Sequence, residues 1–258
     1  MHDLIVVGAG VAGSVLTTMA RERGLDVVLV NDWGGPASAA ALALLRRGWA
    51  RAETDEATDW YEAHGNLTRG ALATYGWNEV SKEQPDWRLV DPESVLVKPD
   101  VIARVTNWIP GAVQTGSGAD IRATQVVLSH PVWTSAPPAS YGATALSRTA
   151  QVIGASCRVH WLRPYHAVTA SQKGGWTRVG SSVAATPELA VARLQTMVDE
   201  ATDAGLVTPA RDWYTQEGAR WEVSETERMP GLTMLGGLGR LGFTLAPRNA
   251  RVLLDSWK

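Results

Sequence analysis

Three glycines near the start of the chain have the residue type and spacing of a phosphate-binding turn. They are Gly8, Gly10 and Gly13 in the stretch GAGVAG. In a dinucleotide site the first glycine permits a tight turn, the second lets the backbone approach a pyrophosphate, and the third lets the following helix pack on the preceding strand. The backbone N–H groups of Val11 and Ala12, at the start of that helix, would face the phosphates.

The elements on either side of the glycines are those that such a turn needs. Residues 4–7 form a short apolar run typical of a buried strand, and residues 14–23 carry apolar side chains at helical spacing. Gly24 is expected to end the helix, and residues 27–30, VVLV, predict a second buried strand. A strand, a glycine turn, a helix and a strand within about 30 residues predict a dinucleotide-binding unit.

The ribose end of the expected site departs from the usual pattern. A carboxylate commonly stands at the end of the second strand, where it accepts hydrogen bonds from ribose hydroxyls. Here that place falls on Asn31, with Asp32 next to it. Asn31 can bond a hydroxyl without charge assistance, whereas Asp32 could reach the ribose instead or only cap the following turn. Both residues are candidate cofactor ligands, and the sequence leaves the choice open.

The composition is that of an ordinary globular protein. Of the 258 residues 45% are hydrophobic, and 24 basic against 26 acidic residues give a net charge of −2, which disfavours nonspecific binding to nucleic acid. Cys157 is the single cysteine, so no intrachain disulfide or cysteine-cluster metal site can form, and a cytoplasmic location is expected. We expect no metal ion and no membrane span. The 12 tryptophans are expected in the core and at its rim rather than as base-stacking platforms.

A second glycine-rich stretch, GGLGRLGFTLAP at residues 236–247, lies close to the C-terminus. It resembles the motif Gly-His-Gly-x-x-Gly-x-Thr-x-Ala-Pro of the FAD-dependent D-amino-acid oxidase and glycine oxidase family, with leucine in place of the histidine. In that family the loop crosses the flavin ring and leads into a last helix, here expected at about residues 245–257, with Thr244 as N-cap and Pro247 in the first turn. The positive end of that helix would stabilise charge on the reduced ring. The alternative is a mobile C-terminal hairpin. The resemblance assigns these residues of the stretch to the cofactor: Gly237, Gly239, Arg240, Leu241, Gly242, Phe243 and Thr244.

The stretch GGPASAAALALL at residues 34–45 also resembles this family, in the segment that follows the second strand. The resemblance implies that Ala37, Ser38 and Ala39 lie near the flavin and its pyrophosphate. Taken alone, the stretch is also consistent with an alanine-rich helix that has Ser38 as its N-cap.

Residues 123–135, ATQVVLSHPVWTS, resemble the family's strand that ends beside the nucleotide. The apolar residues 126–128 supply the strand, and Trp133 is implied as a cofactor contact. Pro131 stands where the family has glycine, and a proline fixes φ and lacks the N–H, so the close approach expected there is altered.

The resemblance implies an α/β fold in which a Rossmann-like FAD-binding domain is joined to a smaller α+β substrate domain with an antiparallel sheet. We expect a discontinuous FAD-binding domain, residues 1–140 and 224–258, and a substrate domain at 141–223. In the latter, residues 157–182 alternate polar and apolar around a turn, which predicts antiparallel strands, and residues 187–204 predict an amphipathic helix. By its length, the chain resembles a compact, shortened member of the family.

No catalytic residue can be assigned from the sequence, and four side chains are candidates for the substrate pocket. Arg228 lies near the position of a family arginine that clamps a substrate carboxylate, a task that suits the bidentate guanidinium. An inserted residue before Pro230 leaves a surface salt bridge as the alternative. The other candidates are Tyr165, His166 and Arg240. Hydride transfer from an amine carbon needs positioning and an unprotonated amine, with no obligatory protein base.

The resemblance implies an FAD-dependent oxidoreductase or lyase that oxidises or cleaves a C–N bond of an amine or glycine-like substrate by hydride transfer to flavin N5. Because a shortened chain would leave the flavin more open, a further hypothesis is a glycyl or aminomethyl adduct on a nucleobase of DNA or tRNA. The alternatives are a flavin monooxygenase or other FAD- or NAD-linked reductase, and a non-catalytic flavin or nucleotide binder. A reductase using NADPH would be expected to carry a second glycine fingerprint, and the sequence has none. The oligomeric state and electron acceptor stay open.

Overall fold

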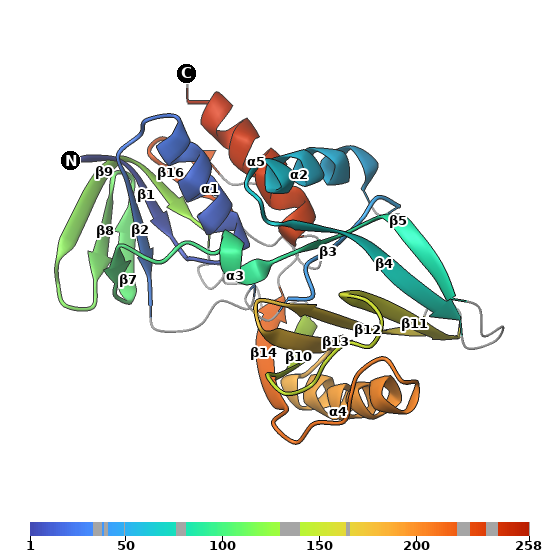
Figure 1. Cartoon of the computed structure of the whole chain (residues 1–258). Coiled ribbons are helices and arrows are strands. Elements are labelled where there is room, and N and C mark those ends of the chain that lie inside the picture. Colours follow the sequence, from blue (N-terminus) through green and yellow to red (C-terminus); the bar gives the residue numbers. More distant parts are fainter. Residues whose placement is uncertain are drawn as a thin grey trace. The chain divides into compact units, whose positions relative to one another are not determined.

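The computed structural model describes residues 1–32, 38, 41–48, 50–75, 81–129, 140–163, 166–220, 228–235 and 242–257. The chain divides into two units, whose elements are labelled in Figure 1. Unit 1 comprises Met1–Ala39, Ser94–Pro137 and Trp221–Lys258, and unit 2 comprises Ala40–Glu93 and Pro138–Arg220. Within the described ranges, no helix combines the length and the apolar character needed to cross a membrane.

Unit 1 is built on an eight-stranded sheet with a parallel centre. Strand β1 (His2–Val7) lies between β2 (Val27–Asn31) and β9 (Asp120–Leu128), and both run parallel to it. The order is β15-β16-β9-β1-β2-β6, and the antiparallel hairpin of β7 and β8 is attached to β9. The remaining strands are β6 (Val101–Ile102), β7 (Val105–Ile109), β8 (Ala112–Thr115), β15 (Arg228–Met229) and β16 (Leu232–Met234).

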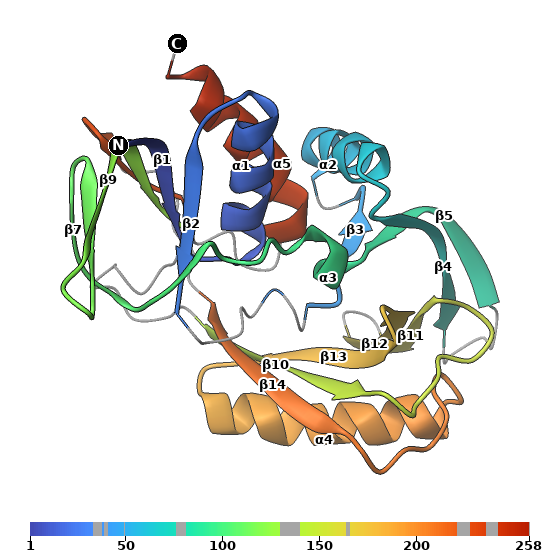
Figure 2. The same ribbon diagram turned by 60° about the vertical axis from the view of Figure 1, so that its left-hand side comes forward.

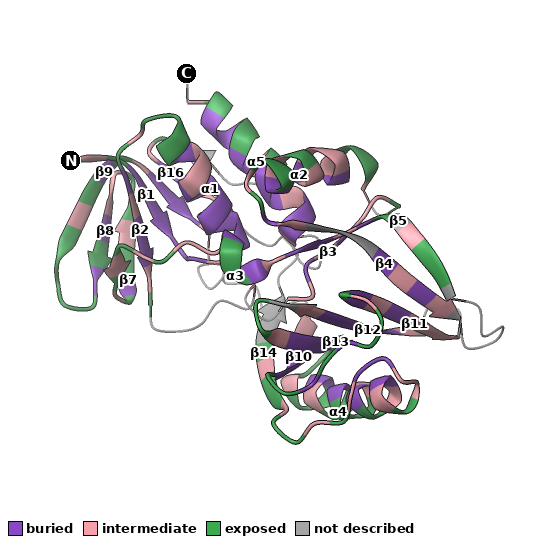
Figure 3. Ribbon diagram, viewed as in Figure 1, coloured by how far each residue is buried: buried purple, intermediate pink, exposed green. Residues whose placement is uncertain are grey.

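Both faces of the sheet are covered at the carboxyl ends of its central parallel strands, which explains why residues 4–7, 27–30 and 126–128 are continuously apolar rather than alternating. Ile5, Val7 and Leu128 belong to one buried cluster with Val105 and Val113 of the hairpin. The other face carries helix α1 (Val11–Glu22), which contacts β1 and β2, and helix α5 (Gly242–Asp255) packs beside α1. Figure 3 shows the buried residues that run along β1 and through both helices. The strand, helix and strand predicted for residues 4–30 are confirmed.

Helix α5 begins earlier than the sequence predicted. It runs Gly242–Asp255 rather than 245–257, so Thr244 is its third residue and is buried instead of acting as N-cap. Pro247 consequently lies in the second turn. A proline there removes one intrahelical hydrogen bond, and the apolar face that α5 buries, which includes Phe243 and Leu253, compensates for that loss.

Unit 2 holds a second eight-stranded sheet in the order β14-β10-β13-β12-β11-β4-β5-β3. Its neighbouring strands are antiparallel except for the parallel pair β4 and β11. The strands are β3 (Leu44–Arg46), β4 (Leu67–Tyr75), β5 (Ser81–Val90), β10 (Ser140–Ser147), β11 (Cys157–Arg163), β12 (His166–Lys173), β13 (Trp176–Ala184) and β14 (Tyr214–Arg220). The predicted antiparallel strands within residues 157–182 are confirmed. The short helix α3 (Pro92–Val95) follows β5.

Helix α4 (Pro187–Asp203) covers one face of this second sheet and confirms the helix predicted for residues 187–204. Its side chains Leu194 and Val198 share a buried cluster with Val168 and Val179 of the sheet. The Thr186 hydroxyl caps the helix by accepting from the backbone N of Leu189 at 3.3 Å. Helix α2 (Arg51–Ala63) contacts β3 and β4.

Residues 40–93 fall in unit 2, whereas the sequence placed them in the FAD-binding domain. Strands β3, β4 and β5 extend the second sheet because β4 pairs in parallel with β11, with Leu72 opposite Arg158. Parallel strands are joined by a long connection rather than by a short hairpin turn, so neither segment carries a local signal that identifies its partner. With these strands included, the second sheet equals the first in strand number.

Candidate dinucleotide-binding site

The glycine turn follows β1 at the carboxyl end of the parallel strands. Gly8 has a φ of 106°, a conformation that favours glycine. A Cβ on Gly13 would lie 1.9 Å from the carbonyl oxygen of Gly8, so no side chain fits there. The hydroxyl of Ser129, directly after β9, lies 2.9 Å from the carbonyl oxygen of Val7 and 2.7 Å from that of Gly8. Sequence reasoning missed Ser129, because only the pairing of β9 with β1 brings it to the turn.

The first turn of α1 has no cap of its own. Gly10 is the N-cap residue and makes no side-chain cap. Instead, the Ser38 hydroxyl accepts from the backbone N of Val11 at 3.0 Å. A Cβ on Gly10 would lie 3.4 Å from the same oxygen. Residues 41–43 have no regular structure and 44–46 form β3, so no helix extends from Ser38 through residues 41–46. Ser38 caps α1 instead.

Gly242, the last glycine of the C-terminal stretch, lies against Val11 at the start of α1. A Cβ on Gly242, the first residue of α5, would lie 3.3 Å from Cγ1 of Val11. At the far ends of the same helices, the Arg23 guanidinium and the Asp255 carboxylate form an ion pair at 2.9 Å. Helices α1 and α5 therefore run parallel with their N-termini together, as Figures 1 and 2 show.

These paired N-termini carry no acidic residue in their first turns. Helices α2 and α4, by contrast, have Glu53 and Glu188 in theirs. Each helix dipole places about half a positive charge at its N-terminus, and here two such ends are adjacent without a carboxylate in either first turn. The arrangement suits an anionic ligand such as a pyrophosphate.

The end of β2 is joined to the glycine turn by hydrogen bonds. The side-chain oxygen of Asn31 accepts from the backbone N of Ala9 at 3.1 Å, and its amide nitrogen donates to the carbonyl oxygen of Asp32 at 2.8 Å. The carbonyl oxygen of Val30 accepts from the backbone N of Gly8 at 2.8 Å. Asn31 is half-buried and Asp32 is exposed, and both lie at the same edge of the sheet as Gly8.

Several sequence-predicted site residues lie outside the described ones. They are Ala37, Ala39, Trp133, Tyr165, Gly237, Gly239, Arg240 and Leu241. For Arg228 and His166 only the backbone is described: Arg228 pairs with Thr233 in β15 and β16, and His166 begins β12. Phe243 and Thr244 are buried at the start of α5. The four catalytic candidates therefore stay predictions.

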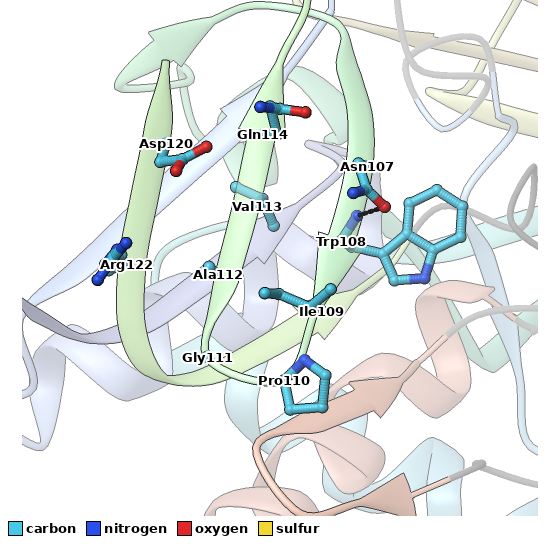
Figure 4. Close-up of a pocket in the computed structure, with 10 residues that line it drawn as sticks. All are labelled: Asn107, Trp108, Ile109, Pro110, Gly111, Ala112, Val113, Gln114, Asp120 and Arg122. Carbon is cyan, nitrogen blue, oxygen red and sulfur yellow. Dashed lines mark hydrogen bonds between the residues drawn. The ribbon is translucent and has the colours of Figure 1, made fainter. Parts of the chain in front are cut away.

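The hollow in Figure 4 is separate from the glycine turn. It has a volume of about 410 Å³ and is lined by residues of β7, β8 and β9. Asp120 and Arg122 stand on its wall at the amino end of β9, whereas Leu128 at the carboxyl end is paired with Val7 beside the turn. The hollow therefore belongs to the opposite end of β9 and forms no part of the candidate dinucleotide site.

Comparison with known proteins identifies the fold. No family model matches the chain, and no curated protein sequence does. Among solved structures, the iminodiacetate oxidase from Chelativorans has a TM-score of 0.72 at 15% identity, over 97% of this chain and 94% of that one. The glycine oxidase from Bacillus cereus has a TM-score of 0.72 at 15% identity, over 100% of this chain and 96% of that one.

The chain has the glycine oxidase fold. A glycerol-3-phosphate dehydrogenase from Bacillus halodurans, solved in complex with FAD, is similar with a TM-score of 0.67 at 14% identity, over 99% of this chain and 64% of that one. The predicted fold class, a Rossmann-like unit combined with a second sheet, is thereby confirmed. In this glycine oxidase fold, the described glycine turn, Ser38 and the start of α5 come together within unit 1.

Proposed function

We propose that the chain is an FAD-dependent oxidoreductase that oxidises or cleaves a carbon–nitrogen bond of a small amine or amino acid. The observation that carries the proposal is the close approach of Gly242 to Val11, where a Cβ on Gly242 would lie 3.3 Å from Val11 Cγ1, at the N-termini of two parallel helices. Proteins similar in fold include glycine oxidase, iminodiacetate oxidase and a dehydrogenase solved with FAD, which supports the choice of cofactor and reaction class.

The described residues fit FAD at its phosphate end. The first intrahelical bond of α1 runs from Ser14 N to Gly10 O, so the N–H of Ala12 precedes the ladder and would donate to the pyrophosphate. The Ser38 hydroxyl accepts from Val11 and would donate its own proton to a phosphate oxygen. Gly10 would leave room for that approach because it has no side chain.

The start of α5 is proposed to serve the reactive end of the cofactor. FAD, when bound, supplies the acceptor for the hydride of the substrate's amine carbon. The first turn of α5, from Gly242 to Thr244, has no acidic residue, and its dipole would stabilise negative charge that develops there. Arg228 is proposed to bind a substrate carboxylate, and Tyr165, His166 and Arg240 to line the pocket.

An anaerobic titration tests this function. Purified protein is loaded with FAD, and glycine, sarcosine, iminodiacetate or a glycyl-modified oligonucleotide is added while the flavin absorption band is recorded. We expect bleaching by a free amine or amino acid. Bleaching by the oligonucleotide alone would move the substrate to the nucleobase adduct. FAD uptake without bleaching by any of the four would favour a non-catalytic flavin binder, and uptake of NAD with no uptake of FAD would refute the proposal.

A further inference from the structure

Asn31 occupies the position at which a ribose-binding carboxylate is usual, but its side chain makes hydrogen bonds to the protein backbone. Its oxygen accepts from Ala9 N and its nitrogen donates to Asp32 O. Its backbone carbonyl also accepts from the N of Ala103 at 2.9 Å. Asn31 thus joins the glycine turn, the residue that follows β2, and the segment after β6.

These bonds need an amide at position 31. An amide offers an acceptor and a donor, whereas a carboxylate only accepts. An aspartate at this position could still accept from Ala9 N, but it would set a charged oxygen against the carbonyl oxygen of Asp32, which now lies 2.8 Å from the amide nitrogen. The identity of Asn31 is explained by bonds within the protein, without any ribose contact.

We infer that Asp32 binds the ribose hydroxyls of the dinucleotide, and that Asn31 is a positioning residue that fixes the glycine turn and the Asp32 backbone. The inference rests on the proposed function. Asp32 is exposed at the edge of the sheet to which the turn belongs, directly after the bonded Asn31. A carboxylate accepts from two vicinal hydroxyls more strongly than a neutral amide does. The ribose-binding carboxylate is therefore at position 32 in this chain, one residue after its usual place.

The test compares Asp32→Asn with the wild type in the FAD-free protein. Three dissociation constants are measured: for FAD by flavin fluorescence, and for ADP and 2′,3′-dideoxy-ADP by calorimetry. We expect Asp32→Asn to weaken FAD and ADP about tenfold, as the loss of charge assistance to a hydrogen bond implies, and to leave dideoxy-ADP unchanged. The melting temperature without ligand should stay the same. Asp32→Glu should restore part of the lost affinity.

The variant Asn31→Asp distinguishes two roles for position 31, because a direct contact with the ribose and a positioning role predict opposite effects on FAD affinity. If position 31 held the ribose, the added carboxylate would tighten FAD. On our inference it lowers the melting temperature of the FAD-free protein and does not tighten FAD. Should this variant fail to fold, the ADP comparison on Asp32→Asn decides alone.

Three results would overturn the inference. One is tighter FAD binding by Asn31→Asp, another is an Asp32→Asn variant with wild-type affinities, and the third is an equal loss for ADP and dideoxy-ADP. In each of them the wild type still binds FAD, so the proposed function survives. A wild type that binds neither FAD nor ADP would refute both proposals.

Discussion

Gly13 is the residue of the turn at which a side chain is excluded by backbone atoms. The nearest atom to an added Cβ is the Gly8 carbonyl oxygen at 1.9 Å, and the Ser129 hydroxyl follows at 2.5 Å. A carbonyl in a bonded turn cannot rotate away as a flexible side chain does. We therefore expect Gly13→Ala to lower the free energy of unfolding by at least about 3 kcal/mol, the upper end of ordinary overpacking, in urea denaturation.

Gly48→Ala is the matched control for Gly13→Ala. Gly48 is exposed, and an added Cβ there meets no atom within 4 Å. Its free energy of unfolding should stay within about 0.5 kcal/mol of the wild type. Equal effects of the two substitutions would show that the close packing of helix on strand at Gly13 is not what makes glycine necessary.

The Asp212 carboxylate accepts several hydrogen bonds from the end of β10 and the loop that follows it. The hydroxyls of Ser147 and Thr149 each donate to its carboxylate at 2.5 Å, and the backbone N–H groups of Arg148 and Thr149 donate as well. These hydrogen bonds, led by that of Ser147, hold the pKa of Asp212 well below its ordinary 3.8. A carboxyl with a lowered pKa in the folded state stabilises that state above its ordinary value and loses the contribution as the pH falls through the lower one.

We expect Asp212→Asn to lower the melting temperature at pH 7, and the difference from the wild type to shrink as the pH is taken below about 3.8. Thermal unfolding at both pH values measures this. Asp59→Asn, which removes an exposed carboxylate on α2, is the control for the loss of one negative charge. A deficit of Asp212→Asn that is constant with pH would contradict the role of its charge.

At the scale of elements, the N-termini of α1 and α4 are capped by serine or threonine hydroxyls that come from different places in the chain. The cap of α4 is local, from Thr186 to Leu189 N, whereas the cap of α1 comes from Ser38, 27 residues along the chain. A local cap leaves a sequence signature. A distant cap joins two segments, and in α1 it leaves the N-cap position to a glycine, which has no side chain to obstruct the proposed pyrophosphate.

Ser38→Ala and Thr186→Ala should each lower the free energy of unfolding by about 1 kcal/mol, the usual effect of losing a hydroxyl cap. The two variants should differ in FAD binding. Ser38→Ala weakens it, because α1 faces the proposed pyrophosphate, and Thr186→Ala leaves the dissociation constant unchanged. Fluorescence titration alongside urea unfolding gives both quantities. If Thr186→Ala weakened FAD as much as Ser38→Ala does, capping at α1 would have no special part in the site.

At the scale of the whole molecule, each unit has its own core. Leu128 is buried in the cluster that also contains Ile5 and Val7 of β1, and Leu194 is buried in the cluster between α4 and the second sheet. Truncation of either to alanine should cost about 2–5 kcal/mol of stability, because each leaves a cavity. All the described residues assigned to FAD belong to unit 1.

We therefore expect Leu128→Ala to weaken FAD binding and Leu194→Ala to leave it unchanged, when both variants are measured well below their melting temperatures. The two leucines are equally buried, and the same substitution is made at both. A difference in FAD affinity between the variants therefore shows which unit FAD binding depends on, and not how far each variant is destabilised. A loss of FAD affinity in Leu194→Ala equal to that in Leu128→Ala would mean that binding does not depend on unit 1 alone.

The sequence by itself determined the elements whose signals are local. Three such signals depend on spacings of a few residues: the glycines at 8, 10 and 13 with their flanking apolar runs, the strands on either side of the turn at 174–175, and the amphipathic helix that begins at Pro187. For the same reason, Gly242 could be assigned to a helix-leading loop, although the start of α5 was misplaced by three residues.

Only the tertiary structure decided which distant residues meet. Four features depend on pairings between segments far apart in the chain: Ser129 at the glycine turn, Ser38 on α1, Val11 against Gly242, and the place of β3, β4 and β5 in the second sheet. The partners of Asn31 are of the same kind. Such contacts leave no periodicity in either segment, because each side chain is selected by a neighbour that only the folded backbone brings into reach.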